Sequence, residues 1–134
     1  MSTTKGVDRG EAEQVIVLMV LASWADGKVE GTEALAIQRL VAAHPLLLHA
    51  RPISQIAEET KGRLREKGMD ACLQEASAAL PDRSYRELAF QCCAKVMGAD
   101  RAFPVEEESV LRKLQDLLGF DVATAERLLV LAMR

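Results

Sequence analysis

Residues 15–33 read VIVLMVLASWADGKVEGTE, an unbroken apolar run that leads into an acidic turn. Its first eight residues are all apolar, so a helix formed here has no polar face and needs neighbouring helices on every side. Asp26-Gly27 then gives a turn signal, because Gly readily adopts the left-handed backbone that ends helices. The apolar spacing of a helix resumes after Gly31. The stretch therefore predicts a buried helix, a tight acidic turn and a second, amphipathic helix.

The same arrangement recurs without a gap 74 residues later. Ala99-Asp100-Arg101-Ala102-Phe103 repeats the turn, and Glu107 takes the place of Glu33. Leu111 keeps the apolar character of Ile37 in the helix that follows. We interpret the two copies as related helix-turn-helix pairs.

The rest of the chain also shows helical patterns, separated by prolines and glycines. Aromatic residues make up only 4% of the sequence, so the core must consist of aliphatic side chains, which favours helices packed on helices. We predict an all-α fold, a single compact bundle of about seven helices with two pseudo-symmetric helix-turn-helix pairs. One domain is expected over residues 1–134, with residues 1–7 flexible.

Two of the predicted helices carry capping signals. Asp8 and Glu11 have the spacing of a capping box at the start of the first helix. Asp121 can cap the last helix, which we expect to dock on the bundle through Leu128, Leu129, Leu131 and Ala132.

The composition argues against partners of several classes. The net charge is −3 with acidic and basic residues interspersed, so no basic surface for nucleic acid is expected. No secretory signal is visible, and the longest apolar run, residues 15–22, is far shorter than the roughly 20 residues of a membrane span. Cys72, Cys92 and Cys93 lack CxxC spacing and are predicted to be reduced residues in or near the core. We expect a cytoplasmic protein.

The first acidic turn is not an EF-hand. A calcium loop of that type needs oxygen ligands at its third and twelfth positions. Counted from Asp26, these positions hold Lys28 and Ile37, and in the second copy they hold Ala102 and Leu111. None of these four side chains can ligate Ca²⁺.

Residues 25–33 instead resemble the signature of TerB-like domains of tellurite-resistance proteins, a fold also found at the N-terminus of DjlA-type co-chaperones. That signature is an apolar helix, then Ala-Asp-Gly, a hydrophobic residue and a Glu that enters a second helix, and Ala25-Asp26-Gly27-Lys28-Val29-Glu30-Gly31-Thr32-Glu33 matches it. Leu118-Gly119-Phe120-Asp121 resembles the closing turn of the family. The second copy departs from the signature at Arg101 and Pro104.

The resemblance implies an all-helical domain with an acidic surface, associated with tellurite and other chemical stress responses. Because the chain lacks a catalytic constellation, we expect a non-enzymatic module of such a response that mediates protein interactions. The resemblance also implies binding of a divalent cation, Ca²⁺, Mg²⁺ or Mn²⁺, by acidic side chains. The implied ligands are Asp26, Glu30 and Glu33, with Asp100, Glu106 and Glu107 as the weaker copy.

These carboxylates also have a structural explanation that needs no ion. An Asp in a turn accepts hydrogen bonds from free backbone N–H groups, and a Glu in a first helical turn complements the helix dipole. Both Asp26 and Glu33 fit these roles.

Three consecutive leucines, Leu46, Leu47 and Leu48, follow the helix-breaking Pro45. They cannot all face one core, so at least one is predicted to be exposed or to contact a protein partner or a second copy. No catalytic constellation accompanies them, because the serines lack a G-x-S-x-G frame and His44 and His49 lack further zinc ligands. We therefore expect no enzyme. The alternative function is a structural adaptor or a homo-oligomerising domain without metal.

Overall fold

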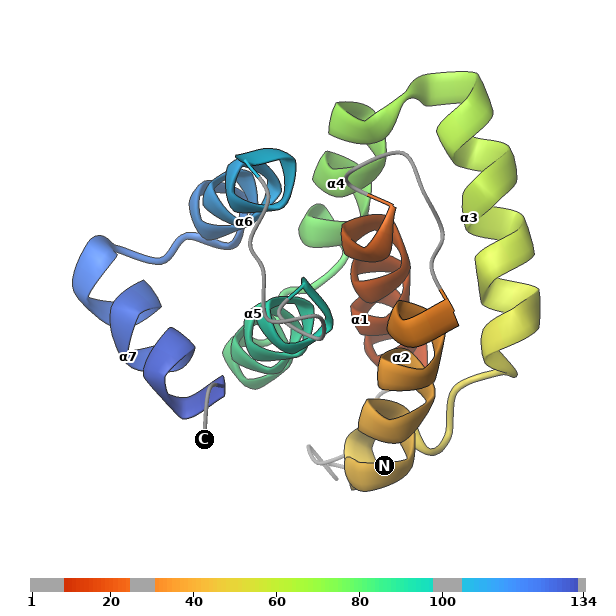
Figure 1. Cartoon of the computed structure of the whole chain (residues 1–134), viewed down its shortest axis with the longest axis horizontal. Helices are drawn as coiled ribbons and strands as arrows, with labels where there is room; N and C mark the ends of the chain where they lie inside the picture. The colour runs from red at the N-terminus through yellow and green to blue at the C-terminus, as the bar shows by residue number, and fades with distance from the viewer. Residues whose placement is uncertain (1–8, 25–30, 98–104, 133–134) are drawn as a thin grey trace.

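The computed structural model describes residues 9–24, 31–97 and 105–132, and every regular element among them is a helix (Figure 1). This confirms the all-α prediction, and residues 1–7 lie outside the described part. None of the helices in these ranges is long and apolar enough to cross a membrane. The elements are α1 (Arg9–Ser23), α2 (Gly31–Ala43), η1 (Pro45–Leu47), α3 (Ile53–Lys67), α4 (Met69–Ala78), α5 (Arg83–Met97), α6 (Val105–Leu118) and α7 (Val122–Ala132).

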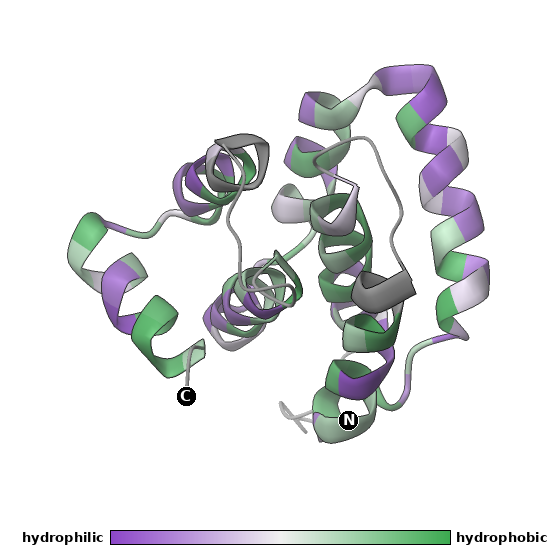
Figure 2. Cartoon of the chain, in the orientation of Figure 1, coloured by the Kyte–Doolittle hydropathy of each residue, from purple (hydrophilic) through white to green (hydrophobic). Residues whose placement is uncertain are grey.

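Helix α1 lies at the centre of the bundle, as its lack of a polar face predicts. Every side chain from Val15 to Ala22 is buried, and α1 packs against α2, α3, α4, α5, α6 and η1. Figure 2 shows it as a largely hydrophobic ribbon enclosed by helices with mixed surfaces. The apolar run therefore forms the middle of one core.

The two predicted helix-turn-helix pairs meet through their first helices. Helix α1 packs against α2, α5 packs against α6, and α1 and α5 make the most extensive helix contact of the described structure. Tyr85, Leu88, Ala89, Cys92 and Val96 form a helically spaced apolar stripe on α5, and all five are buried. Phe90, Cys93, Ala94 and Met97, outside that stripe, are buried as well. Helix α5 is wrapped on more sides than its periodicity indicates because α7 covers it as well.

Glycine and proline set the helix ends where the sequence places them. Gly68 separates α3 from α4 at φ 85°, and Gly119 ends α6 at φ 80°, both in the left-handed region that favours glycine. The predicted cap of α7 is present, since Asp121 Oδ1 accepts a hydrogen bond from the Thr124 N–H at 2.8 Å.

The start of α5 holds the ends of two other helices. The Arg86 guanidinium donates to the carbonyl of Leu80 and, at 3.3 Å, to that of Leu118. Arg83 lies 5.6 Å from the centre of the Phe120 ring, which makes an edge-to-face contact with Phe90 at 5.7 Å. These contacts fix the turns after α4 and α6 to one short segment.

Two carboxylates of α1 tie the helix to distant parts of the chain. Glu11, predicted as a capping partner of Asp8, accepts a hydrogen bond from the backbone N–H of Asp82 at 3.1 Å. Glu13 accepts from both the side chain and the backbone N–H of Arg51, at 3.0 and 3.2 Å. Arg51 also pairs with Glu59 on α3 through two hydrogen bonds of 2.7 and 2.9 Å.

The docking prediction for α7 is wrong at one position. Leu128 and Ala132 are buried and Leu129 is partly buried, but Leu131 is exposed. Helix α7 lies at the edge of the molecule against α5 (Figure 1), so a single neighbour covers only part of its circumference. Leu131 lies outside that covered part.

Two adjacent leucines should differ sharply in their contribution to stability. Leu47 is completely buried, whereas 59% of Leu48 is exposed. We expect Leu47→Ala to lower the free energy of unfolding by about 2–4 kcal/mol because it opens a cavity in the core. Leu48→Ala is expected to change it by less than about 0.5 kcal/mol. Urea denaturation of both variants measures the difference, and equal losses would contradict the described burial.

Candidate functional site

The leucine segment forms a short 3₁₀ helix because Pro45 interrupts α2. Pro45 has no N–H to continue the helix, and the next bonds close over three residues, from Leu47 N–H to the His44 carbonyl at 2.9 Å and from Leu48 N–H to the Pro45 carbonyl at 3.3 Å. A 3₁₀ helix has three residues per turn, so consecutive side chains point in three directions.

This geometry separates the three leucines. Leu47 points into the core, Leu46 is half-buried and Leu48 is exposed. The prediction that at least one of them is exposed is confirmed. A partner cannot reach the side chain of Leu47, so the predicted partner-binding set reduces to Leu46 and Leu48.

A groove of about 310 Å³ runs between this segment and α5. An engineered protein cavity of about 150 Å³ accommodates benzene, so the groove has room for an apolar side chain of a partner. Leu46 and Leu88 give the groove an apolar lining. We define the η1 surface as Leu48 together with the lining residues His44, Pro45, Leu46, Ser84, Glu87, Leu88 and Gln91.

The electrostatics of the η1 surface are unusual for this protein. No charged side chain occurs from Leu40 to Ala50, although 28% of the chain is charged. Burial, and then the positive charge of Lys95, lower the pKa of His44, which keeps this imidazole neutral at pH 7. Glu87 is engaged by Arg83 at 3.0 Å, whereas Lys95 forms no ion pair within the described residues. The surface therefore combines apolar side chains with polar ones and a paired carboxylate, and Lys95 lies near it without an ion pair among the described residues.

The predicted cation ligands cannot be placed. Asp26, Glu30 and Asp100 lie outside the described residues, and so do the side chains of Glu33, Glu106 and Glu107 at the starts of α2 and α6. Within the described part of the chain, no group of three His, Cys, Asp or Glu side chains could hold a metal ion. Cation binding at the acidic turns stays a prediction.

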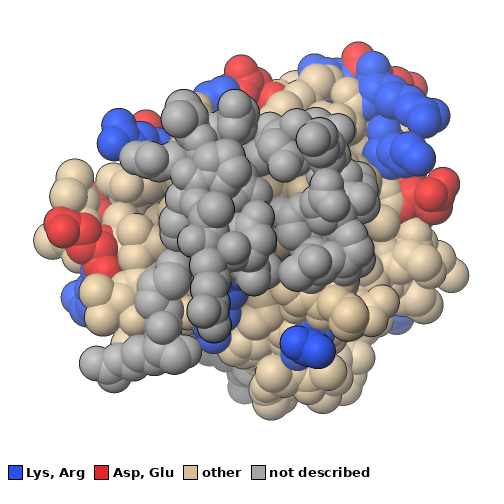
Figure 3. Space-filling model, in the orientation of Figure 1, with Lys and Arg blue, Asp and Glu red and all other residues tan. Residues whose placement is uncertain are grey.

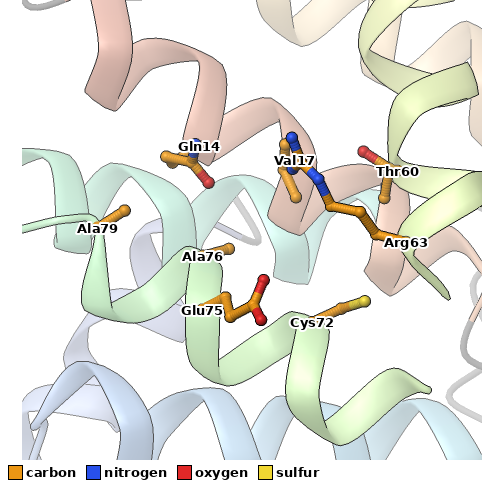
Figure 4. Close-up of a pocket in the computed structure, with 8 residues that line it drawn as sticks. All are labelled: Gln14, Val17, Thr60, Arg63, Cys72, Glu75, Ala76 and Ala79. Carbon is orange, nitrogen blue, oxygen red and sulfur yellow. The ribbon is translucent and has the colours of Figure 1, made fainter. Parts of the chain in front are cut away.

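The three cysteines are free and buried, as predicted. Burial raises the pKa of Cys92 to about 12 and that of Cys93 well above its ordinary value. Cys72 borders a cavity of about 180 Å³ between α1, α3 and α4, where Arg63 and Glu75 also line the wall (Figure 4). Burial raises its pKa as well, so none of the three thiols is an activated nucleophile at neutral pH.

The charged face of α3 is solvated. Only Ile56 and Thr60 of this helix are fully buried, and Figure 3 shows basic and acidic side chains mixed along its edge of the molecule. Lys67 pairs with Glu75 of α4 at 2.6 Å. This face offers no surface of one charge sign.

Comparison with known proteins identifies the family from most of the chain. Residues 10–129 match the family described as tellurite resistance protein TerB, which covers α1 and extends into α7. The chain belongs to the TerB family. No curated protein and no solved structure matches it.

Several residues of the η1 surface have no signal in the sequence. The apolar pattern of α5 predicts only its buried stripe, to which Leu88 belongs. Ser84 and Gln91 lie outside that stripe, and the groove arises because η1 packs nearby. In the sequence, Lys95 looks like any lysine on a helix surface. Its effect on the pKa of His44 indicates that it lies near the η1 surface. The uncharged run from Leu40 to Ala50 is the one sequence signal that points to this site.

The lowered pKa of His44 predicts a dependence of stability on pH. The unfolded chain holds this proton more tightly than the folded protein does, since an unfolded histidine has a pKa near 6.5. The contribution of His44 is therefore complete above pH 6.5 and is lost as the pH falls through the folded pKa. We expect His44→Gln to flatten the decline of the urea midpoint between about pH 7.5 and pH 5. His49→Gln, at an exposed position of the same segment, is the control, and equal profiles for wild type and His44→Gln would contradict the prediction.

Proposed function

We propose that this TerB-family chain is a non-enzymatic interaction module that binds a protein partner through the η1 surface. The observation that carries the proposal is the exposure of Leu48, 59%, next to a groove lined by Leu46 and Leu88. An exposed large apolar side chain beside a groove that is partly lined by leucines is typical of a surface that a partner covers.

The absence of charge over the segment supports this function further. Protein interfaces are depleted of charged residues at their centre, and His44 is neutral at pH 7. Charged groups near the rim, Lys95 and the Arg83–Glu87 pair, supply the polar boundary that interfaces have.

A non-enzymatic role is supported by the chemistry of the described side chains. The three thiols stay protonated at neutral pH, and the Thr60 hydroxyl at the Cys72 cavity donates to the carbonyl of Ile56 at 2.7 Å. The family description names tellurite resistance, so we propose that the interaction serves resistance to tellurite or a related oxyanion.

Photo-crosslinking at the η1 surface tests the proposed function. With p-benzoylphenylalanine in place of Leu48, we expect a covalent adduct with a distinct protein in tellurite-stressed cells. The same replacement of Gln74, an exposed residue on α4, is expected to give none. The purified adduct partner should then bind the wild-type chain, and Leu48→Asp should weaken that binding at least about tenfold, as loss of a central apolar contact does.

The stability of Leu48→Asp and the growth of the host on tellurite serve as controls for this experiment. Leu48→Asp should unfold at nearly the wild-type temperature because the side chain packs little in the free protein, and it should reduce growth of the host on tellurite. A partner that binds wild type and Leu48→Asp equally well would refute docking at this surface.

We also propose that a divalent cation binds at the acidic turns and modulates the interaction. The support is the match of residues 25–33 to the family signature and the repetition of the acidic turn within the matched region. Two or three carboxylates on a turn suit a hard cation that keeps most of its water, which implies weak affinity.

Titration calorimetry with Ca²⁺, Mg²⁺, Mn²⁺ and Zn²⁺ tests the cation proposal. We expect one of the first three ions to bind with a dissociation constant on the order of a millimolar or below, since the site has few protein ligands. Replacing Asp26 by Asn together with Glu33 by Gln should abolish the heat. No heat from the wild-type chain at millimolar ion retires the proposal.

A further inference from the structure

We infer that copies of this chain associate head to tail, with α7 of one copy on the η1 surface of the next. The inference rests on the proposed function in that it uses the same surface and names its occupant. The starting observation is that α7 carries an apolar and acidic stripe that no other described helix covers.

The stripe consists of Val122, Glu126 and Val130. The three residues are spaced four apart, so they lie along one side of the helix. Val122 is 66% exposed and Val130 58%, the former being the most exposed large apolar residue described. Glu126 is exposed and forms no ion pair within the described residues. Figure 3 shows acidic atoms among uncharged ones over this outer edge of the molecule.

The η1 surface has the complementary character. Leu48 is exposed, Leu46 is half-buried, and the mostly buried Leu88 lines the groove. Lys95, on the same helix as Leu88, adds a positive charge that forms no ion pair within the described residues. Glu87 of the groove lining is paired with Arg83, so each surface combines aliphatic side chains with one charge that has no ion pair among the described residues, and these two charges have opposite sign.

The dimensions of the two surfaces also agree. Glu126 lies four residues, about 6 Å along α7, from each valine of the stripe, and Lys95 lies four residues, about 6 Å along α5, from Gln91 of the groove lining. A valine of α7 in the groove therefore leaves Glu126 within reach of the long Lys95 side chain. Arg127, beside the stripe, lies near Asp121 and helps to lower the pKa of that carboxyl after the hydrogen bonds from Thr124, so its charge is partly balanced within its own copy.

The two surfaces are different, so the contact is heterologous. A pair keeps one unused η1 surface, on one copy, and one unused α7 stripe, on the other, so assembly continues until a ring closes or a filament grows. A protein partner that presents an apolar and acidic helix would compete for the same surface, which gives self-association a role in regulating partner binding.

Mixing two defective variants tests the inference. We expect light scattering to show wild-type mass rising above 14.7 kDa with concentration, whereas Leu48→Asp and Val130→Asp each stay monomeric. An equimolar mixture of the two variants should form a dimer and nothing larger, because only one intact η1 surface and one intact stripe remain. Gln74→Asp, with the same added charge on α4, should assemble like wild type.

A charge exchange provides the second test. Lys95→Glu and Glu126→Lys should each weaken assembly at least tenfold, and the double variant should recover most of it. Circular dichroism of each variant confirms its fold before comparison. A wild-type chain that stays monomeric at millimolar concentration overturns the inference, and so does a mixture of Leu48→Asp and Val130→Asp that forms no dimer. In either case the crosslinking at Leu48 still decides the proposed function, because that experiment detects a different protein.

Discussion

The fold depends on burying a helix that has no polar side. From Val15 to Ala22 every residue of α1 is apolar and buried, so the helix is stable only when neighbours surround it. Two carboxylates in its first turns help to hold the neighbouring segments in place. Glu11 and Glu13 accept hydrogen bonds from Asp82 and Arg51, which lie 71 and 38 residues away along the chain. Buried carboxylates are costly without partners, so these bonds select one arrangement of the surrounding helices.

Once α1 is central, the positions of the remaining helices follow. Helix α5 lies along it and is itself nearly surrounded, and Arg86 fixes the ends of α4 and α6 to its start. Helix α7 is the last to be placed and contacts mainly α5. Its position leaves Val122, Val130 and Leu131 exposed. At η1, the turn made by Pro45 places Leu47 in the core and leaves Leu48 exposed.

Features that are local in sequence could be predicted, whereas those that depend on neighbours could not. Gly68 and Gly119 end helices because of their own backbone freedom, and Asp121 caps α7 through a residue three positions away. The periodicity of α7 predicts that Leu131 is buried, but it is exposed. Periodicity indicates which side of a helix is apolar, not how much of that side a neighbouring helix covers. The groove beside Leu46 is formed with residues of α5 about forty positions further along the chain. The pattern of neither segment indicates that the two pack together. The prediction of a cation site at the acidic turns rests only on the sequence motif and the family match.

Exposed leucine and valine side chains are a hazard for a bundle whose core is otherwise complete. Leu48 contributes little to the stability of the free chain, so stability gives no reason for an apolar residue at this position. A polar residue there would lower the risk of nonspecific association at almost no cost to folding. The charges near both exposed surfaces, Lys95 by the groove and Glu126 within the α7 stripe, act against nonspecific contact because an ill-matched partner leaves a charge without a counterpart. The combination of apolar side chains with a charge that has no ion pair in the described part of the chain therefore favours selective over nonspecific contacts. This combination distinguishes the two surfaces from the solvated face of α3.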